Sequence, residues 1–435
     1  MQTYFLDQLD AATTPKLLHR NALDAADLSA QVQEVLTTVQ QGGDAALRDY
    51  TAKFDGIADA PLRLDADAIA QAAESLTATE REALKTAYQN LEAFHRAQLP
   101  APLRVETMPG VVCWQEARPI ERVALYVPGG TAPLPSTLLH LGVPARVAGC
   151  ERIVVLTPPQ KDRLLHPAIA GALQLLQVEE VFLLGGAQAI AAVAYGTETV
   201  PRVDKVFGPG NRYVTTAKTL LAGRGILAMD LPAGPSEVLV IADDQANPEH
   251  VAIDLLAQAE HGADSQVVLC ITSEEAAKQV QLALEEQLAT LPRANYARKA
   301  LEQSYILIAD DIRALVEFSN HYAPEHLILN CRNPEALAPL IRNAGSVFMG
   351  PYTPESVGDY ASGTNHTLPT SGLARAYSGV NTMAYLKMIT FQQLDEQGLR
   401  NVGPAVMEIA RMETLDAHRL AVALRLTSGP ISNED

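Results

Sequence analysis

The sequence predicts an α/β protein with parallel sheets. Between about residues 120 and 350, eight short runs rich in Val, Ile and Leu alternate with segments of helical periodicity. The apolar residues of these runs are nearly continuous, which suits strands that helices cover on both faces. The runs are RVALYVP, RIVVLTP, EVFLLGG, EVLVIAD, SQVVLCI, SYILIAD, EHLILN and AGSVFMG. We therefore expect two incomplete Rossmann-like domains, at residues 120–235 and 236–350.

The regions on either side have a different texture. From about residue 24 to 98, apolar residues recur at spacings of three and four, which predicts a mainly helical N-terminal region within residues 1–119. From Pro351, a loop rich in Gly, Ser, Thr and Pro precedes a helix expected from about Pro404 to Leu424. A loop of this length is more typical of a functional segment than of a connection. We expect residues 351–435 to form an active-site loop and a smaller C-terminal helical extension.

The composition favours a folded chain and argues against some partners. Hydrophobic residues make up 48% of the 435 residues and charged residues 19%, which suits two or more buried cores. The formal net charge of -18 disfavours nucleic acid and anionic membranes, because both need clustered Lys and Arg. No apolar run reaches the ~18 residues of a membrane span, and the first residues do not resemble a secretory signal. We expect a small-molecule substrate and a cytoplasmic location.

The cysteines show no pattern that indicates chemistry. Cys113, Cys150, Cys270 and Cys331 lie tens of residues apart and form no CxxC pair. This spacing argues against a thiolate zinc site and against a disulfide scaffold, and it suits a reducing compartment. Each cysteine is expected to be a small buried apolar residue.

Three glycine turns follow predicted strands, although the GxGxxG dinucleotide fingerprint is absent. The turns are YVPGG at 126–130, GGAQ at 185–188 and FGPGN at 207–211, and the last continues with Arg and Tyr where a third glycine would stand. Each turn could bring backbone N–H groups or a helix start to a ligand. Ordinary turn chemistry is the alternative reading for each of them.

A predicted helix starting near Asn247 carries a candidate metal-binding pair. Gln258 and His261 are three residues apart, so on a helix they share one face and can meet one ion, and Gly262 suits the helix end. Amide oxygen and imidazole form an uncommon ligand pair. The alternative is a histidine at a helix end beside a solvated glutamine.

Further acids and histidines follow in three places. Glu325 and His326 precede the predicted strand LILN, where the carboxylate could activate water and the imidazole could carry protons. An exposed charged loop is the alternative there. The long loop contains the run ESVGDYASGTNH at 355–366, which supplies a carboxylate and an imidazole. Glu413 and His418 stand near the end of the chain.

A series of long motifs resembles the histidinol dehydrogenase family. The motifs are YVPGG, GGAQAIAA, FGPGN, MDLPAGPSEV, the segment ending QAEHG at 258–262, YAPEHL and DYASGTNHTLPT. Together they extend from about Tyr126 to His418, and the series is far more specific than any single motif. The resemblance implies oxidation of L-histidinol through bound L-histidinal to L-histidine, with two NAD+ and water, in the last steps of histidine biosynthesis.

The resemblance also implies roles for individual residues. One Zn2+ per subunit would be held by Gln258, His261, Asp359 and His418. The catalytic pair would be Glu325 and His326. The substrate would contact the four metal-binding residues and the catalytic pair, and also Ser236, His366 and Glu413. NAD+ would be contacted by Tyr126, Gln188 and Asn211. The family forms homodimers with active sites shared between subunits, so the C-terminal segment would reach the partner's site.

Other functions use similar residues. A zinc hydrolase or deaminase would also use Gln, His and Asp ligands with a Glu–His pair, but it would not consume NAD+. A non-catalytic binding protein would not need Glu325 and His326. A related zinc- and NAD-dependent amino-alcohol or sulfonate dehydrogenase is the nearest alternative, and the presence of His366 and Glu413 favours histidinol over its substrates.

Overall fold

The computed structural model describes residues 1–20, 26–129, 133–160, 164–232 and 234–427. Gly130 of the first glycine turn, Ala233 of the MDLPAGPSEV motif and the last eight residues of the expected C-terminal extension lie outside this part. The chain forms two compact units. The first unit combines residues 1–98 with 120–385, and the second combines 99–119 with 386–435.

The first unit contains two parallel sheets, and the first of these is built mainly from residues 120–230. Its strands, in spatial order, are β2 (Arg63–Leu64), β7 (Glu180–Leu183), β6 (Arg152–Thr157), β5 (Arg122–Tyr126), β8 (Lys205–Phe207) and β9 (Ala228–Met229). All pairings are parallel except that of the short edge strand β2 with β7. The sheet is therefore a Rossmann-like sheet with one antiparallel edge.

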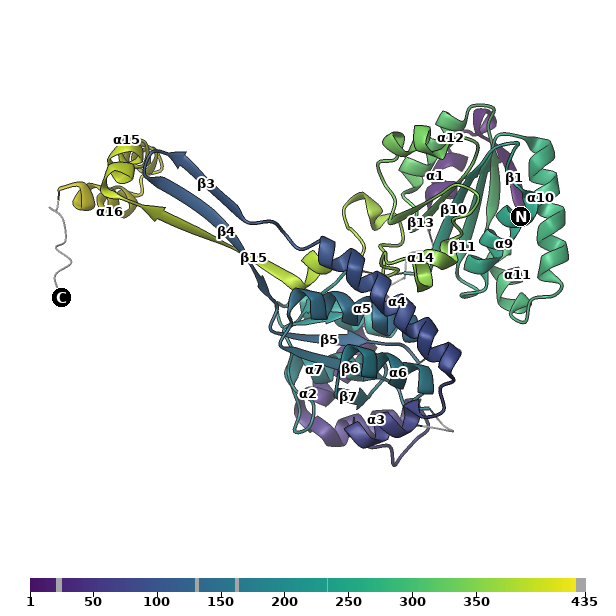
Figure 1. The fold of residues 1–435 in the computed structure, drawn as a ribbon, viewed down its shortest axis with the longest axis horizontal. Helices are drawn as coiled ribbons and strands as arrows, with labels where there is room; N and C mark the ends of the chain where they lie inside the picture. The colour runs from purple at the N-terminus through teal and green to yellow at the C-terminus, as the bar shows by residue number, and fades with distance from the viewer. Residues whose placement is uncertain (21–25, 130–132, 161–163, 233, 428–435) are drawn as a thin grey trace. The chain divides into compact units, whose positions relative to one another are not determined.

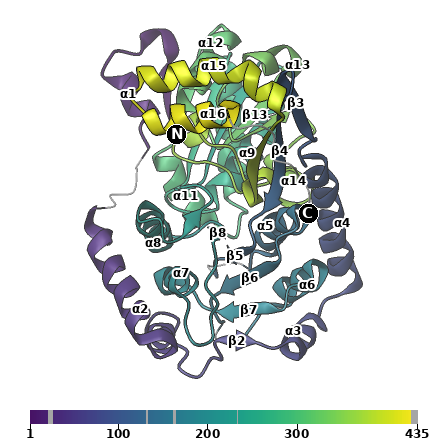
Figure 2. The same cartoon turned by 90° about the vertical axis from the view of Figure 1, so that its left-hand side faces the viewer.

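Helices cover both faces of this first sheet. On one face α2 packs against α7 and α8, and on the other α4 packs against α5 and α3 against α6 (Figure 2). The helices are α2 (Ala26–Phe54), α3 (Ala66–Ala73), α4 (Ala78–Ala97), α5 (Pro135–Ala148), α6 (Pro167–Leu176), α7 (Gly186–Tyr195) and α8 (Arg212–Gly223). α2 contains a break at Gly43, which has a φ of 53°.

The second sheet is entirely parallel. Its strands, in spatial order, are β1 (Gln2–Phe5), β12 (Tyr305–Ile308), β11 (Gln266–Ile271), β10 (Glu237–Ala242), β13 (His326–Asn330) and β14 (Ser346–Met349). All eight apolar runs of the sequence are strands, five in this sheet and three in the first. Every residue of β10 and β13 is buried, which explains why these runs lack alternating polar residues.

Helices also cover both faces of the second sheet. α9, α10 and α11 lie on one face, and α1 and α12 lie on the other (Figure 1). The helices are α1 (Thr13–Leu18), α9 (Pro248–Ala259), α10 (Glu274–Leu288), α11 (Ala294–Glu302), α12 (Ile312–Tyr322), α13 (Pro334–Leu337) and α14 (Glu355–Tyr360). Short 3-10 turns lie at Leu6–Gln8, Ala338–Leu340, Leu373–Arg375 and Thr382–Tyr385.

The two sheets share one strand order. When the strands of each domain are numbered along the chain, β7-β6-β5-β8-β9 and β12-β11-β10-β13-β14 both follow the order 3-2-1-4-5. In each sheet an extra strand from the N-terminal region, β2 or β1, extends the edge next to strand 3. The mainly helical region expected at residues 1–119 therefore also supplies strands to both sheets. The four-part division of the chain stays a prediction about domain boundaries.

The second unit is an antiparallel sheet followed by two helices. β15 (Leu386–Leu394) pairs with β4 (Val111–Pro119), which pairs with β3 (Leu103–Met108), and α15 (Glu396–Met412) and α16 (Asp416–Thr427) pack on each other (Figure 1). α15 begins where the Asp395 side chain accepts a hydrogen bond from Gly398 N at 2.7 Å and caps the helix.

The single helix expected from Pro404 to Leu424 is wrong. The Asp395 cap starts α15 at Glu396, so Pro404 lies inside the helix and not at its start. Thr414 then adopts a φ of 59° and separates α15 from α16. Across the described residues, no helix is both long and apolar enough to cross a membrane.

Candidate functional site

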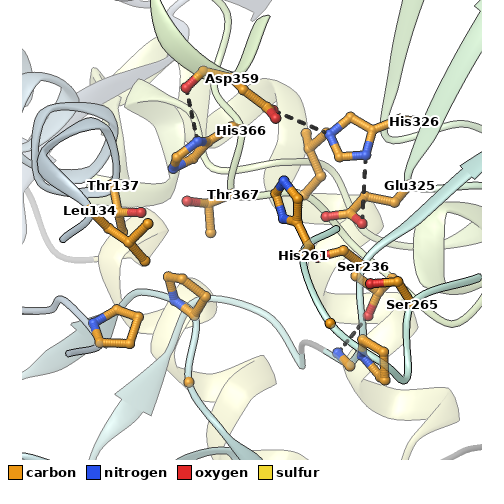
Figure 3. A pocket seen from close by; sticks show the side chains of 18 of the residues that line it. Leu134, Thr137, Ser236, His261, Ser265, Glu325, His326, Asp359, His366 and Thr367 are labelled. Carbon is orange, nitrogen blue, oxygen red and sulfur yellow. Dashed lines mark hydrogen bonds and ion pairs between the residues drawn. The ribbon is translucent and has the colours of Figure 1, made fainter. Parts of the chain in front are cut away.

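A cavity of about 520 Å³ lies between the two Rossmann-like domains of the first unit. The first domain contributes Pro128, Leu134, Ser136, Thr137 and the turn Pro209–Arg212. The second domain and the long loop contribute Ser236, His261, Glu325, His326, Asp359 and His366 (Figure 3). Six of the site residues predicted from the sequence thus line one cavity with Asn211.

The first domain presents the carboxyl ends of its strands. Tyr126 ends β5, Gln188 lies in the first turn of α7 after β7, and Asn211 caps α8 after β8. The Asn211 side chain accepts hydrogen bonds from Tyr213 N and Val214 N, at 3.0 and 3.2 Å. This edge therefore collects helix N-termini, whose backbone N–H groups attract anions.

Tyr126 and Gln188 are buried behind this edge and do not line the cavity. The Tyr126 hydroxyl accepts a hydrogen bond from Gly186 N at 3.1 Å, and burial raises the pKa of Tyr126 to about 12. A contact of either residue with NAD+ stays a prediction.

A buried ion pair braces the third glycine turn. Lys218 Nζ donates to the carbonyl oxygen of Gly208 at 2.9 Å, and Asp230 Oδ2 accepts from Gly208 N at 2.7 Å. Lys218 and Asp230 also contact each other, and both side chains are almost fully buried. Gly208 has a φ of 120°, and a Cβ there would stand 2.1 Å from the backbone carbonyl oxygen of Tyr126, so only glycine fits. Sequence reasoning missed this brace because no local spacing signals it.

The second domain presents the amino ends of its strands. Ser236 directly precedes β10, Glu325 directly precedes β13, and α9 ends beside the start of β11. Gln258 lies in the last turn of α9, and His261 follows in the turn beyond it, where His261 N donates to Gln258 O at 3.2 Å. The helix ends at Ala259 with Glu260 as its C-cap, before the expected glycine cap at Gly262.

Gln258 is fully buried with nothing in the described chain to bind. Neither its amide oxygen nor its amide nitrogen has a hydrogen-bond partner among the described residues. A buried amide without partners is costly, so a ligand outside the protein would be needed to satisfy it. The alternative of a solvated glutamine is therefore wrong.

The main chain of Glu237 meets both members of the expected catalytic pair. Glu237 N donates to Glu325 Oε2 at 2.9 Å, and His326 Nδ1 lies 3.1 Å from Glu237 O. The Glu237 side chain is itself buried and paired with Arg20 at 2.9 Å. Because Glu325 and His326 are both buried, the alternative of an exposed charged loop is wrong. Arg20 and Glu237 were not identified from the sequence, because their partners are distant along the chain.

Burial and charge shift both ionisation equilibria. Burial raises the pKa of Glu325 to about 7, although the charge of His326 lowers it. Burial alone would lower the pKa of His326, but the carboxylates of Glu355, Glu325 and Asp359 raise it well above its usual value. The three carboxylates therefore stabilise the protonated form of His326, and Glu325 is a base poised near neutral pH.

The long loop begins with the short helix α14, which carries two further acids. His326 Nε2 lies 3.5 Å from Asp359 Oδ1, and His326 Nδ1 lies 3.7 Å from Glu355 Oε1. Ligand atoms of these three residues all lie within 4.8 Å of one another, a geometry that could hold a metal ion. His366 Nδ1 lies 3.1 Å from the Asp359 carbonyl oxygen (Figure 3).

Glu355 was not assigned a role from the sequence. It is 1% exposed, and neither of its carboxylate oxygens has a hydrogen-bond partner among the described residues. Burial raises the pKa of Glu355 well above its usual value, although the charge of His326 lowers it. Its spacing of four from Asp359 puts the two acids on one helix face, and this was the available signal.

The chain resembles known proteins over nearly its whole length. Residues 18–426 match the family model described as histidinol dehydrogenase. Curated histidinol dehydrogenases from Vibrio cholerae and Xylella fastidiosa (strain Temecula1) are 50% and 52% identical, over 98% of this chain and 98% and 99% of theirs. The chain belongs to the histidinol dehydrogenase family. A crystal structure of the enzyme from Elizabethkingia anophelis matches with a TM-score of 0.95 and 47% identity, over 98% of both chains.

Histidinol dehydrogenases are NAD-dependent oxidoreductases of histidine biosynthesis, and the predicted α/β fold with parallel sheets is that of the family. Two residues implied by the family resemblance lie in the second unit. Glu413 follows the last turn of α15, His418 lies in the first turn of α16, and both are exposed within that unit. Their roles in binding substrate and metal stay predictions.

Proposed function

We propose that this chain catalyses the zinc-dependent oxidation of L-histidinol, through bound L-histidinal, to L-histidine, with two NAD+ and one water. The observation that carries the proposal is the buried Gln258 amide without hydrogen-bond partners, one helical turn before His261, which lines the same cavity between the two Rossmann-like domains as the Glu325–His326 pair. An orphaned ligand group, a water-activating acid and a proton acceptor are the parts that this reaction needs.

The donor set fits a zinc ion. Gln258, His261, Asp359 and His418 would hold it, with nitrogen and oxygen atoms that zinc accepts. Burial lowers the pKa of His261, while Asp359 raises it, so the ring is kept in the neutral form that binds metal. When bound, zinc would anchor the amino and imidazole nitrogens of the substrate and orient its alcohol carbon.

In the first oxidation, His326 takes the proton of the substrate's hydroxyl group, while hydride leaves the carbon that bears this hydroxyl and goes to NAD+. The three carboxylates around the ring stabilise the protonated imidazole that results. The Glu237 carbonyl near Nδ1 holds the ring, so Nε2 is the atom that exchanges the proton. The product of this step is the bound aldehyde.

Glu325 acts after the aldehyde has formed. Its carboxylate removes a proton from water, the water oxygen bonds to the aldehyde carbon, and protonated His326 returns its proton to the former carbonyl oxygen. A gem-diol results, and His326 is neutral again. That carbon then gives a second hydride to a second NAD+, and His326 again accepts a proton. The hydrogen bond from Glu237 N holds the carboxylate in place.

No cysteine takes part in this scheme. Cys150, Cys270 and Cys331 are buried, and burial raises the pKa of all three thiols, to about 12 for Cys150 and about 11 for Cys331. Such thiols are poor nucleophiles at neutral pH. Free cysteines also suit the cytoplasmic location that we propose.

The carboxyl edge of the first sheet is the proposed NAD+ site, with Tyr126, Gln188 and Asn211 as contacts. Its helix N-termini suit the pyrophosphate without a GxGxxG turn. Ser236, His366 and Glu413 would bind the substrate beside the metal ligands. Ser236 and His366 line the cavity, which supports this assignment.

The working form is proposed to be a homodimer in which Glu413 and His418 complete the partner's site. Large apolar side chains are exposed on the two helices of the second unit and in the turn between them, which supports a partner there. They are Ile409, Met412, Leu415, Leu420 and Leu424.

A mixing experiment tests this sharing. One chain carries Gln258→Ala and His261→Asn, the other carries only His418→Asn, and each is expected to be inactive alone. In a heterodimer, one site has the second chain's Gln258 and His261 with the first chain's His418, so activity returns to at most one site per dimer. Zero recovery in verified heterodimers would place all four ligands in one chain.

The reaction itself is tested by stoichiometry. Purified protein with L-histidinol should yield two NADH per histidinol consumed, chelation should abolish activity, and zinc should restore it. Accumulation of free histidinal with one NADH would refute the four-electron reaction. Faster turnover of another amino alcohol or of a sulfonate would favour the related dehydrogenases instead.

A further inference from the structure

His366 lines the cavity, and His140 lies directly behind it. It is a fully buried residue of α5, in a stretch otherwise filled by apolar side chains such as Leu139 and Leu141. Its ring stacks on that of His366, with centroids 4.1 Å apart and planes inclined by 23°. His366 lines the cavity and His140 does not, so His140 cannot touch a ligand there.

Two hydrogen bonds tie the same part of the loop to His140. The backbone N–H of His366 donates to His140 Nδ1 at 3.0 Å, and Asn365 Nδ2 donates to the His140 carbonyl oxygen at 2.5 Å. A backbone N–H can only donate, so Nδ1 of His140 must be unprotonated. Burial lowers the pKa of His140 well below its usual value, which keeps the ring in that neutral form.

These contacts fix the His366 ring from three sides. His140 covers one face of the ring and holds its backbone, and the Asp359 carbonyl lies 3.1 Å from its Nδ1 (Figure 3). With Nδ1 engaged, Nε2 is the ring atom that remains to meet a ligand. The orientation of that atom is therefore set by His140 on one side and Asp359 on the other.

We propose that His140 is a positioning residue that orients His366 for the substrate. The inference rests on the proposed role of His366 in binding histidinol, and it assigns a function to a histidine that lies within the apolar run STLLHLGVPA. His140 acts in two ways, through the Nδ1 acceptor and through the stacked ring. Misplacing a binding group weakens every contact that it makes with the substrate.

Three substitutions separate the two contributions. His140→Leu removes both, His140→Phe keeps a ring without the acceptor, and His140→Asn keeps an acceptor near Nδ1 without the ring. We expect His140→Leu to weaken histidinol binding about tenfold, measured by calorimetry on the zinc-loaded protein and as KM. His140→Asn should recover a part of this loss. The KM for NAD+ should not change.

A matched control is Val143→Ala, one turn further along the same buried helix. It should lower Tm through lost packing and leave histidinol affinity unchanged. If His140→Leu does not fold, the pair His140→Phe and His140→Asn still tests the acceptor. Equal histidinol affinity in all His140 variants and the wild type would overturn the proposal.

A double-mutant cycle with His366→Asn decides between positioning and general structural support. If His140 acts through His366, His140→Leu has no further effect on histidinol affinity once His366→Asn is present. Additive losses would show that His140 supports the fold and would overturn the inference, while the role of His366 stands. A His366→Asn variant with normal histidinol affinity would instead overturn the proposed role of His366, and the inference with it.

Discussion

The two Rossmann-like domains have the same strand order but present opposite edges to the cavity. Tyr126 and Asn211 lie at the carboxyl ends of β5 and β8, the usual place for ligands in such sheets. Ser236 and Glu325 lie at the amino ends of β10 and β13, the corresponding pair of strands in the second sheet. Equal topology therefore does not place the functional residues at equal positions.

The difference follows from the helix ends that each edge collects. At the carboxyl edge of the first sheet, α7 and α8 begin, and their N–H groups favour anions such as a pyrophosphate. At the amino edge of the second sheet, α9 and α12 end, and helix C-termini favour cations. One fold thus offers an edge that favours anions and an edge that favours cations, and one of each faces the cavity of this chain.

The buried charges differ in the same way. In the first domain Lys218 and Asp230 neutralise each other and hold a backbone turn. In the second, Glu325, Glu355 and Asp359 surround one histidine, and no Lys or Arg forms a described ion pair with any of the three. We infer that the buried charges of the first domain fix the conformation of a backbone turn, and that those of the second domain serve proton transfer.

The largest expected effect comes from the catalytic pair. His326→Asn should lower both hydride transfers by about 10²–10⁴-fold, because proton acceptance is needed in each. Glu325→Gln should slow histidine formation more than the first hydride transfer, because water is activated only after the aldehyde forms. Single-turnover NADH formation measures the two steps. Identical step profiles for the two variants would contradict this division.

A smaller loss of activity is expected from a change of Glu355, which lies beside His326 and Asp359 in the second domain. Glu355→Gln removes a buried carboxyl group next to His326 and Asp359. Groups that contact metal-binding residues from behind typically change metal affinity or activity about 10–100-fold. Zinc affinity by chelator competition and kcat are the measurements. Glu275→Gln, an exposed acid on α10, is the control. Unchanged zinc affinity and unchanged kcat would show that the cluster is inert.

Whether an element of the fold could be predicted from the sequence depends on whether neighbouring residues along the chain carry its pattern. The eight strands were predictable because helices cover both faces of each sheet, which leaves unbroken apolar runs. β3 was missed because every residue of it is exposed, so LRVETM carries no burial pattern. The break between α15 and α16 depends on the single left-handed residue Thr414, for which the sequence gives no warning.

The site divides in the same way. Gln258 with His261, and Glu325 with His326, are neighbours along the chain, so spacing alone suggested them. The partners of Glu237, His140 and Lys218 are brought together only by the fold, and no short motif contains both members of such a contact. The position of His418 relative to Gln258 was implied by family resemblance and stays a prediction.

Loss of the Lys218–Asp230 ion pair of the first domain should weaken the binding of NAD+ and leave the binding of histidinol unchanged. Replacing both partners, Lys218→Met with Asp230→Leu, avoids leaving one buried charge unpaired but frees both backbone groups of Gly208. The turn before Asn211 then loses its brace, and we expect KM for NAD+ to rise about tenfold while histidinol affinity stays unchanged. An equal loss for both ligands would mean that the two edges are not independent.

The smallest expected effect is a difference in pH dependence between the two domains. Burial raises the pKa of Glu325 to about 7, so its carboxylate form is lost as pH falls through that value. Between pH 7.5 and 6.5 the ionised fraction falls about threefold, and the rate of the second oxidation should fall with it. Tyr126, at the opposite edge, has a pKa of about 12 and does not titrate in this range, so KM for NAD+ should stay constant. Steady-state rates with histidinal as substrate measure the first quantity, and Glu325→Gln should abolish the slope. A slope that persists in that variant would assign the titration to another group.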